Sequence, residues 1–323
     1  MKQPDFDDIV EARKLVSQYL PKTPLVYSWK LSNLLGCDYY IKCENLQPVG
    51  AFKVRGGVNL IGSLTDEEKK QGVISASTGN HGQSIAFAGK LFGVRVIIYA
   101  PEQNVNMLKV QAMRDLGAEV RLHGRDFDEA REVVESVAKK EGLRYIHSAN
   151  EPKLIAGVGT MGLEIFEDLP DADVVIVPVG AGSGACGNGL VAKHLNPKVK
   201  VIGVQSHQAP AVWHAWKENH LNPCSVMTCE HEGIATRIPF EMTTTILRQV
   251  LDDFILVSDR HINDAIGLLS NNTKLIAEGA GAASLAAAIS VRDQLKGKKV
   301  VGILSGGNIT PEKFAAVTSQ LSH

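Results

Sequence analysis

The chain has 323 residues, of which 44% are hydrophobic, and its formal net charge at pH 7 is −1. This length allows a large buried core and suggests two structural units. With a net charge near zero, no strong overall field favours nucleic acid, an anionic membrane or a polyanionic substrate, so we expect a small-molecule partner.

The amino-terminal segment, residues 1–16, is charged and has a helical pattern without the apolar stretch of a signal peptide. The cysteines are odd in number and contain no C-x-x-C pair, which is typical of a reducing compartment. They are Cys37, Cys43, Cys186, Cys224 and Cys229. We therefore predict a cytoplasmic protein.

Short β-branched runs alternate with helix-like amphipathic stretches along the chain, which predicts an α/β fold. These runs occupy residues 73–77, 94–100, 119–124, 174–180, 199–205, 254–258 and 299–307. Continuously apolar strands such as Val174–Val179 indicate burial on both faces, as in a parallel sheet covered by helices.

The strand–helix alternation is compact and complete between residues 73 and 149. We therefore predict a small mobile domain, residues 73–149, inserted into a large domain formed by residues 1–72 and 150–323. A ligand is expected between the two sheets, at strand carboxyl ends where helix amino termini point inward. The apolar segment Gly279–Val291 is too short to cross a membrane and predicts a buried helix.

Three glycine-bearing loops follow predicted strands, at residues 77–83, 180–187 and 305–308. The second precedes a predicted helix at residues 188–195, so its amides and the helix dipole can hold a phosphate. Its glycines also match the dinucleotide fingerprint, but the next strand ends in Gln205 where a ribose-binding carboxylate is expected. The phosphate of a shorter cofactor is favoured, and a glycine-rich turn without a ligand stays open.

Lys53 lies where a Pro- and Gly-containing segment ends and a predicted helix begins. The helix dipole and the flanking Phe52 and Val54 disfavour its ammonium form, so the amine becomes available for a Schiff base. The pattern alone leaves open that Lys53 is a solvated surface lysine.

Four motifs, in this order, resemble the threonine/serine dehydratase and serine racemase family of fold-type II (tryptophan-synthase-like) pyridoxal phosphate enzymes. They are Ala51–Gly56, Ser77–Gln83, the loop Gly180–Gly187 and Leu304–Asn308. The likeness continues through residues 147–160 and 277–282 and covers nearly the whole chain. It implies two open parallel-type sheets wrapped by helices, with a small domain inserted in a large one.

The resemblance implies that pyridoxal 5'-phosphate forms a Schiff base with Lys53, that Phe52 supports its ring and that Asn80 bonds the ring hydroxyl. Ser305 would face the pyridine nitrogen. The phosphate would be held by the amides of Gly180, Ala181, Gly182, Ser183 and Gly184. The substrate carboxylate would be held by Ser77, Thr78, Gly79, Asn80 and His81. Glu278 and Gly233 also match family positions near the cofactor, without an assigned role.

The implied activity is an ammonia-lyase (dehydratase) acting on L-serine, L-threonine or a related β-hydroxy amino acid. The Ser305 hydroxyl gives the pyridine nitrogen no counter-charge, so the ring is a weaker electron sink and a long-lived carbanion is disfavoured. Once Lys53 removes the α-proton, loss of the β-hydroxyl relieves the developing charge, and a 2-oxo acid and ammonia result.

Thr78 keeps two related activities open. Racemases of the family typically carry at this position a serine that acts as acid/base, whereas many threonine dehydratases carry alanine. The Thr78 hydroxyl can donate a proton, but its β-branch restricts the rotamers. Serine racemase activity and threonine-synthase-like β-replacement therefore remain alternatives. A non-catalytic regulatory protein that binds pyridoxal phosphate is disfavoured because Lys53, Asn80 and Ser305 are intact.

No metal site is expected. Gln205 and Ala211 stand where racemase relatives place the carboxylates that bind a divalent cation, and their side chains lack such oxygens. The spacing of a later group is too irregular for zinc: His207, His214, His220, Cys224, Cys229 and His231. The resemblance also implies a homodimer.

Overall fold

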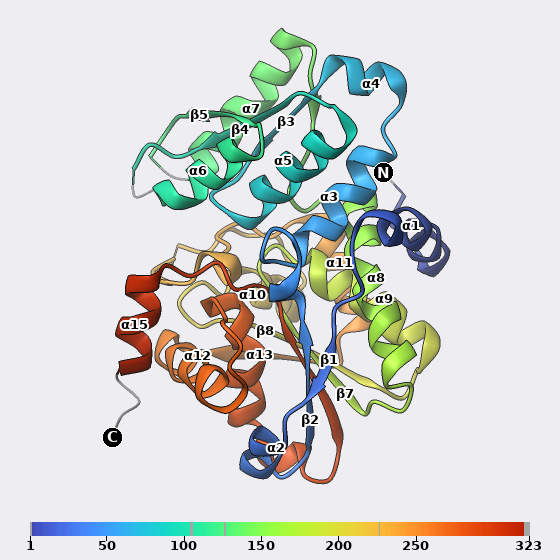
Figure 1. The fold of residues 1–323 in the computed structure, drawn as a ribbon, viewed down its shortest axis with the longest axis vertical. Helices are drawn as coiled ribbons and strands as arrows, with labels where there is room; N and C mark the ends of the chain where they lie inside the picture. Colours follow the sequence, from blue (N-terminus) through green and yellow to red (C-terminus); the bar gives the residue numbers. More distant parts are fainter. Residues whose placement is uncertain (1, 104–105, 126, 226, 320–323) are drawn as a thin grey trace. The chain divides into compact units, whose positions relative to one another are not determined.

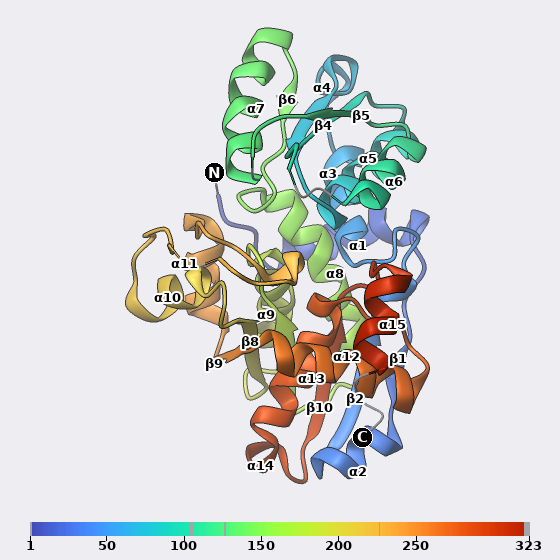
Figure 2. The same ribbon diagram turned by 90° about the vertical axis from the view of Figure 1, so that its left-hand side faces the viewer.

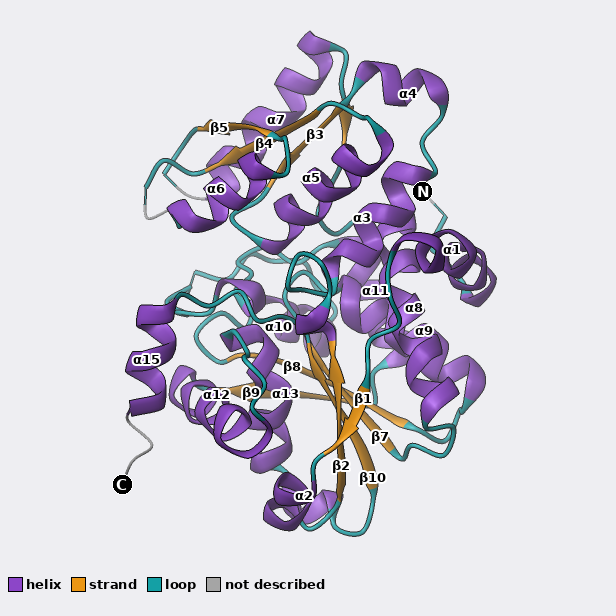
Figure 3. Ribbon diagram, viewed as in Figure 1, coloured by secondary structure: helices purple, strands orange, loops and turns teal. Residues whose placement is uncertain are grey.

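The fold is that of a computed structural model, which describes residues 2–103, 106–125, 127–225 and 227–319. The chain divides into two compact units, each with its own sheet. Unit 1 comprises Met1–Leu20 and Lys53–Val158, and unit 2 comprises Pro21–Phe52 and Gly159–His323. Figure 3 shows the strands of both sheets in orange.

The described part of unit 1 contains a four-stranded sheet in the order β5-β4-β3-β6. Every pairing in it is parallel. The strands are β3 (Val73–Ala76), β4 (Val96–Ala100), β5 (Glu119–Leu122) and β6 (Arg144–Tyr145). All residues of β3 and β4 are buried, as expected for apolar strands with both faces covered.

Helices cover both faces of this sheet. On one face, Ala130, Val134 and Ala138 of α7 pack against Ile74 and Ile97. Figure 2 shows α7 on that side of the sheet and α5 and α6 on the other. The helices of unit 1 are α1 (Phe6–Tyr19), α3 (Lys53–Gly62), α4 (Asp66–Gln71), α5 (Asn80–Phe92), α6 (Met107–Asp115) and α7 (Phe127–Glu141), and α8 (Pro152–Asp168) begins in it.

The described part of unit 2 contains a six-stranded sheet in the order β1-β2-β10-β7-β8-β9. The edge strand β1 is antiparallel to β2, and the other pairings are parallel. The strands are β1 (Leu25–Tyr27), β2 (Asp38–Cys43), β7 (Val174–Pro178), β8 (Lys200–Ser206), β9 (Asp253–Val257) and β10 (Lys299–Leu304). Figure 3 labels all six strands, and Figure 1 labels β1, β2, β7 and β8.

The small-residue helix α13 packs on the centre of this sheet. Its Ser284 hydroxyl is bonded to the carbonyls of Ile176 and Ile303, at 3.0 and 3.1 Å. The prediction of a buried helix at Gly279–Val291 is confirmed. The helices of unit 2 are α2 (Trp29–Leu35), η1 (Glu44–Leu46), α9 (Ser183–Leu195), α10 (Ala211–Glu218), η2 (Glu232–Ile234), α11 (Glu241–Val250), α12 (Asp259–Thr273), α13 (Gly279–Ser290), α14 (Arg292–Leu295) and α15 (Pro311–Ser319).

Within the described residues, no helix combines the length and apolar character needed to cross a membrane.

The predicted α/β class with parallel sheets is confirmed, and each of the seven predicted runs contains a strand. Three of the described strands were not predicted: β1, β2 and β6. The helix predicted at residues 188–195 was wrong at its start. Gly182, at φ +101°, lets the chain enter α9 directly at Ser183, so the later glycines of this loop lie inside the helix.

Unit 1 extends beyond the predicted range 73–149 on both sides. The cause is close packing of α3 on α5. A Cβ at Gly57 of α3 would overlap the side chain and backbone of Ser84 on α5, so glycine allows the two helices to touch. The residues from Lys53 to Gly72 therefore belong with the four-stranded sheet. The mobility of the small domain stays a prediction.

Candidate active site

Lys53 is the first residue of α3 and is half-buried. Its backbone carbonyl accepts a hydrogen bond of 2.6 Å from the Ser84 hydroxyl of α5. Together with the close approach at Gly57, this bond fixes the start of α3 against α5. Lys53 therefore lies at a helix start that is held in place by packing and a hydrogen bond. The helix dipole disfavours a positive charge at this position.

The loop from Ser77 to His81 joins β3 to α5. Ser77 Oγ accepts hydrogen bonds from the amides of Gly79 and Gly82, at 3.1 and 2.8 Å. Gly79 is the N-cap and forms no side-chain cap in the described chain. Nor do the Thr78 and His81 amides bond an acceptor among the described residues. The helix start therefore presents amide donors suited to a carboxylate.

Lys109 of α6 packs over this loop. Its Nζ and Cδ lie 3.3 and 3.2 Å from the position that a Cβ at Gly79 would occupy. An ammonium group close to the positive end of a helix dipole raises the local potential for anions. Sequence reasoning missed Lys109 because nothing in the pattern of α6 shows that it reaches a loop thirty residues earlier in the chain.

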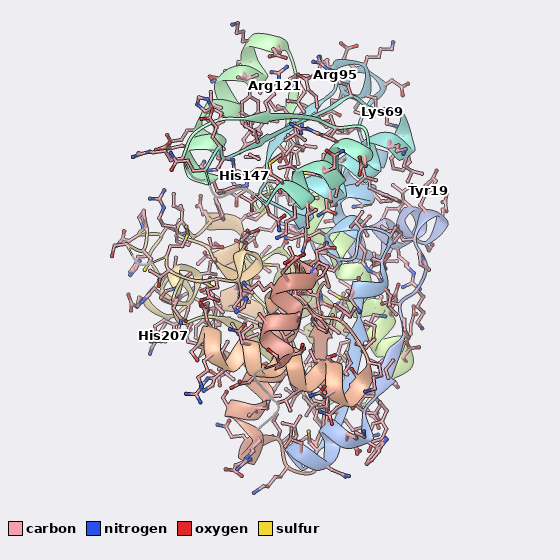
Figure 4. The ribbon with its side chains drawn as sticks, turned by 60° about the vertical axis from the view of Figure 1, so that its left-hand side comes forward. Tyr19, Lys69, Arg95, Arg121, His147 and His207 are labelled. Carbon is pink, nitrogen blue, oxygen red and sulfur yellow. The ribbon has the colours of Figure 1, made fainter. Side chains whose placement is uncertain are left out.

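His81 is buried, and its Nε2 lies 2.9 Å from Ser75 Oγ on β3. Burial, the Lys53 charge and the His147 charge together lower the pKa of His81 to about 3. His147, labelled in Figure 4, follows β6, and burial followed by the Arg131 charge lowers its pKa to about 4. Both imidazoles are neutral at pH 7. The Lys53 charge is one of the causes that lower the pKa of His81.

The second glycine loop, in unit 2, leads from β7 into α9. A Cβ at Gly180 would overlap the carbonyl oxygen of Gly233, and one at Gly182 would lie 2.9 Å from Thr243. The N-cap of α9 is Gly182, which has no side chain to cap the first turn of the helix. A tight glycine loop with amides at a helix start fits a phosphate group.

Phe52 connects this loop to the third one. A Cβ at Gly184 would lie 3.1 Å from the Phe52 ring, and the Phe52 amide donates to the carbonyl of Ser305 at 3.0 Å. Ala51 forms a bridge with Gly306. Unit 2 therefore brings together Phe52, the glycine loop and Ser305, and the next residue along the chain is Lys53.

Ser305 is buried, and Glu278 packs beside it. A Cβ at Gly306 would overlap Glu278 Oε1, and the Glu278 amide donates to the Gly306 carbonyl at 3.0 Å. The position of Glu278, which carried no assigned role in the sequence, is therefore against the loop that carries Ser305.

Gln205 is fully buried, and its Oε1 accepts the Trp213 amide at 3.0 Å. This bond caps α10, whose N-cap Pro210 forms no side-chain cap in the described chain. Gln205, which the sequence comparison marked only as a missing carboxylate, thus caps a helix. Within the described ranges, no three His, Cys, Asp or Glu side chains gather as metal ligands.

A model of the pyridoxal-phosphate dependent enzymes matches residues 16–306. The chain therefore belongs to this family, and the resemblance found in its motifs is confirmed. Its parallel α/β architecture and the glycine loops agree with this class.

Within the family, the chain is similar to threonine-degrading enzymes. It is 41% identical to the L-threonine ammonia-lyase of Thermotoga maritima over 94% of this chain and 75% of that one. It is 37% identical to the catabolic L-threonine dehydratase of Staphylococcus aureus, over 96% and 90%.

Solved structures agree. The processed form of threonine deaminase isoform 2 from Solanum lycopersicum superposes with a TM-score of 0.92 at 32% identity, over 99% of this chain and 95% of that one. Maize serine racemase has a TM-score of 0.92 at 29% identity, over 99% and 98%.

Proposed function

We propose that the protein is a pyridoxal-phosphate dependent ammonia-lyase. It eliminates the β-hydroxyl of L-threonine, L-serine or a related β-hydroxy amino acid and releases a 2-oxo acid and ammonia. The observation that carries this proposal is the arrangement around Phe52 and Lys53, in a chain 41% identical to an L-threonine ammonia-lyase.

Pyridoxal 5'-phosphate, when bound, withdraws electrons from the α-carbon of the amino acid. The residues of this chain fit the group. Lys53 would hold it through its amine, Phe52 would support the ring, and Asn80 and Ser305 would bond its polar edges. The phosphate would be held by the amides of Gly180, Ala181, Gly182, Ser183 and Gly184.

Lys53 Nζ takes the α-proton of the substrate, which requires a neutral amine. The position at the start of α3 favours that form because the helix dipole repels an ammonium. His81 and His147, being neutral at pH 7, place no further positive charge beside the amine.

The substrate carboxylate binds at the start of α5. The Thr78 and His81 amides donate to its oxygens, and the Lys109 ammonium over Gly79 adds a favourable charge. The residues that the sequence predicts for this role are Ser77, Thr78, Gly79, Asn80 and His81. Ser77 contributes by holding the Gly79 and Gly82 amides in place.

The test is product formation by the purified protein reconstituted with pyridoxal phosphate. L-threonine is expected to give ammonia and 2-oxobutanoate, and L-serine to give ammonia and pyruvate. A panel of β-hydroxy amino acids then ranks the side chains accepted. Absence of a 2-oxo acid from every member of the panel contradicts the proposal.

Serine racemase activity is the second candidate. It is favoured by the Thr78 hydroxyl and by the fold similarity to maize serine racemase. Chiral analysis of the serine remaining after partial turnover separates the two activities. If D-serine forms in the native protein and disappears in Thr78→Ala while pyruvate persists, both activities are real; if D-serine never forms, only elimination remains.

The two remaining alternatives are threonine-synthase-like β-replacement and a non-catalytic regulatory role. A nucleophile that captures the product before hydrolysis reveals β-replacement, whereas a protein that binds the cofactor without any turnover is regulatory. The intact Lys53, Asn80 and Ser305 support catalysis.

We also propose that the protein is a cytoplasmic homodimer that binds a small amino acid and neither nucleic acid nor membrane. Support for a reducing compartment comes from the cysteines, all within the described residues and all free thiols. Light scattering on the eluting holoenzyme measures the mass of the assembly.

A further inference from the structure

One buried hydroxyl of unit 1 joins three parts of the chain. Ser75 lies on β3 and is 0% exposed. Its Oγ lies 2.8 Å from the carbonyl oxygen of Ile146, after β6, and 2.9 Å from Nε2 of His81, at the start of α5. The Ile146 amide is itself bonded to Ile74 of β3 at 2.8 Å. The hydroxyl therefore ties the start of α5 to the sheet.

The directions of these bonds follow from the donors present. A carbonyl oxygen only accepts, so the single proton of the Ser75 hydroxyl goes to Ile146. Ser75 Oγ is then an acceptor toward His81, and Nε2 of the imidazole must carry the hydrogen. The tautomer of His81 is thereby fixed, with the lone pair on Nδ1.

Burial and charge agree with a neutral ring. The pKa of His81 is lowered to about 3, first by burial and then by the charges of Lys53 and His147. Turning the ring over would place a C–H group against Ser75 and leave buried polar groups without partners, which is unfavourable. The ring therefore has one orientation and one protonation state.

The start of α5 depends on the Ser75–His81 hydrogen bond because its glycine-rich backbone could otherwise adopt several conformations. The N-cap is Gly79, without a side-chain cap in the described chain, and Gly82 follows in the first turn. Glycines populate many backbone conformations, so the first turn is held by Ser77 on one side and by the Ser75–His81 bond on the other.

We propose that Ser75 is a positioning residue for the reaction: its hydroxyl holds His81 as a neutral imidazole protonated at Nε2, and so fixes the amides that bind the substrate carboxylate. This inference rests on the proposed function of the loop Ser77–His81. Ser75 touches neither substrate nor cofactor in this proposal and acts through His81 alone.

The test compares Ser75→Val, which removes the hydroxyl, with Ser75→Thr, which keeps it, in the full-length holoenzyme. Ser75→Val is expected to raise KM for L-threonine about tenfold, the effect of losing one buried hydrogen bond, with kcat within about threefold of native. Ser75→Thr restores KM. Ser63→Ala is the control, because the Ser63 hydroxyl, directly after α3, donates to the local carbonyl of Leu60 and takes no part in the loop Ser77–His81.

A second readout reports the tautomer directly. Nitrogen-15 spectra of histidine-labelled protein are expected to show His81 protonated at Nε2 in the native chain and in Ser75→Thr, and a mixture in Ser75→Val. If valine is not accommodated in the fold, Ser75→Ala removes the hydroxyl without added volume and gives the same comparison.

Three results would overturn the inference. They are a native KM in Ser75→Val and Ser75→Ala, an unchanged His81 spectrum in both, or an equal loss in Ser75→Thr and Ser75→Val. Loss of the cofactor absorption band together with kcat would also contradict it, because that pattern belongs to general misfolding.

Failure of the proposed function is distinguished by a probe without a β-hydroxyl. Titration of the cofactor band with glycine measures carboxylate binding without elimination. If no amino acid yields a 2-oxo acid, the proposed function fails, but weaker glycine binding in Ser75→Val with an altered His81 spectrum still supports the role of Ser75.

Discussion

The two glycine loops at helix starts are built in different ways. In unit 2, the loop Gly180–Gly184 is shaped by steric contact, since Cβ atoms at its glycines would meet Gly233, Thr243 and Phe52. In unit 1, the loop Ser77–His81 is shaped by hydrogen bonds of side chains and by one lysine laid across it. Both helices have a glycine N-cap.

The difference matches the ligands proposed for the loops. A loop fixed by close packing keeps one shape with or without its ligand, which fits a cofactor phosphate that stays bound. A loop fixed by a few hydrogen bonds has a lower cost of adjustment, which fits a substrate that arrives and leaves at every turnover. Substitutions of single side chains should therefore change substrate binding at the unit 1 loop Ser77–His81. Glycine substitutions should disrupt the unit 2 loop Gly180–Gly184.

The largest effect is expected at the residue that follows Phe52 and begins α3. Lys53→Ala removes the amine that holds the cofactor and takes the α-proton, so activity should fall by roughly a thousandfold or more. The cofactor absorption band should disappear in the same variant. Lys70→Ala, on the exposed α4, is the matched control and should behave as native. A variant without Lys53 that keeps both band and turnover contradicts the assignment.

Acid should weaken the unit 1 loop first. The ordinary histidine pKa of 6.5 is lowered in the fold to about 3 at His81 and about 4 at His147. Between pH 6.5 and about 4 the unfolded chain therefore binds more protons than the native one, and stability falls as pH falls. The loss is on the order of a few kcal/mol and is absent above pH 6.5.

Denaturant melts at pH 7 and pH 5 measure this loss, and His81→Asn should reduce it. Hydrogen exchange should show earlier opening of α5 than of α9, because the unit 2 loop Gly180–Gly184 contains no titrating side chain. Equal sensitivity of the two helices to acid would remove this distinction between the loops.

A methyl group in the unit 2 loop should disturb the phosphate site. Gly182→Ala meets Thr243 at 2.9 Å and also strains a backbone at φ +101°. The expected cost is about 1–3 kcal/mol in stability, together with weaker cofactor binding. Gly142→Ala is the control, because Gly142 has φ +67° and no described atom within 4 Å of its added Cβ. It should show backbone strain alone and native cofactor affinity; equal effects in the two variants would contradict the steric account.

The smallest effect is expected at Lys109. Lys109→Met removes the charge over Gly79 and keeps the side-chain volume, so KM should rise about three- to tenfold without a change in the cofactor band. Lys109→Arg should recover most of the affinity. A native KM in Lys109→Met, measured at low salt where the charge is least screened, means that the amides alone hold the carboxylate.

Some features of the fold followed from local pattern and others did not. Strands β3, β4 and β7 are apolar runs that are buried at every residue, as their composition predicts. Strand β2 was missed because it contains Lys42, which is 0% exposed and pairs with Glu164 of α8 at 2.6 Å. A buried lysine is predictable only when its partner, far away in the chain, is known.

The site shows the same division. The glycine-rich loops and Lys53 stand out in the sequence because they lie in short local motifs. Ser75 and Lys109 do not, since a serine in a strand and a lysine on a helix are ordinary residues whose roles arise from long-range contacts. Gln205 was interpreted only as a missing carboxylate, whereas the fold uses it to cap α10.

The sheet of unit 2 has a consequence for biosynthesis. Its early strand β2 pairs in register with β10, Tyr39 opposite Val300, close to the carboxyl end of the chain. Strand β2 therefore has no partner in β10 until residue 304 has been made, whereas the four described strands of unit 1 emerge before β7. Translation therefore completes the strands of the small sheet first, and the long-range pairing of β2 with β10 closes the large sheet later.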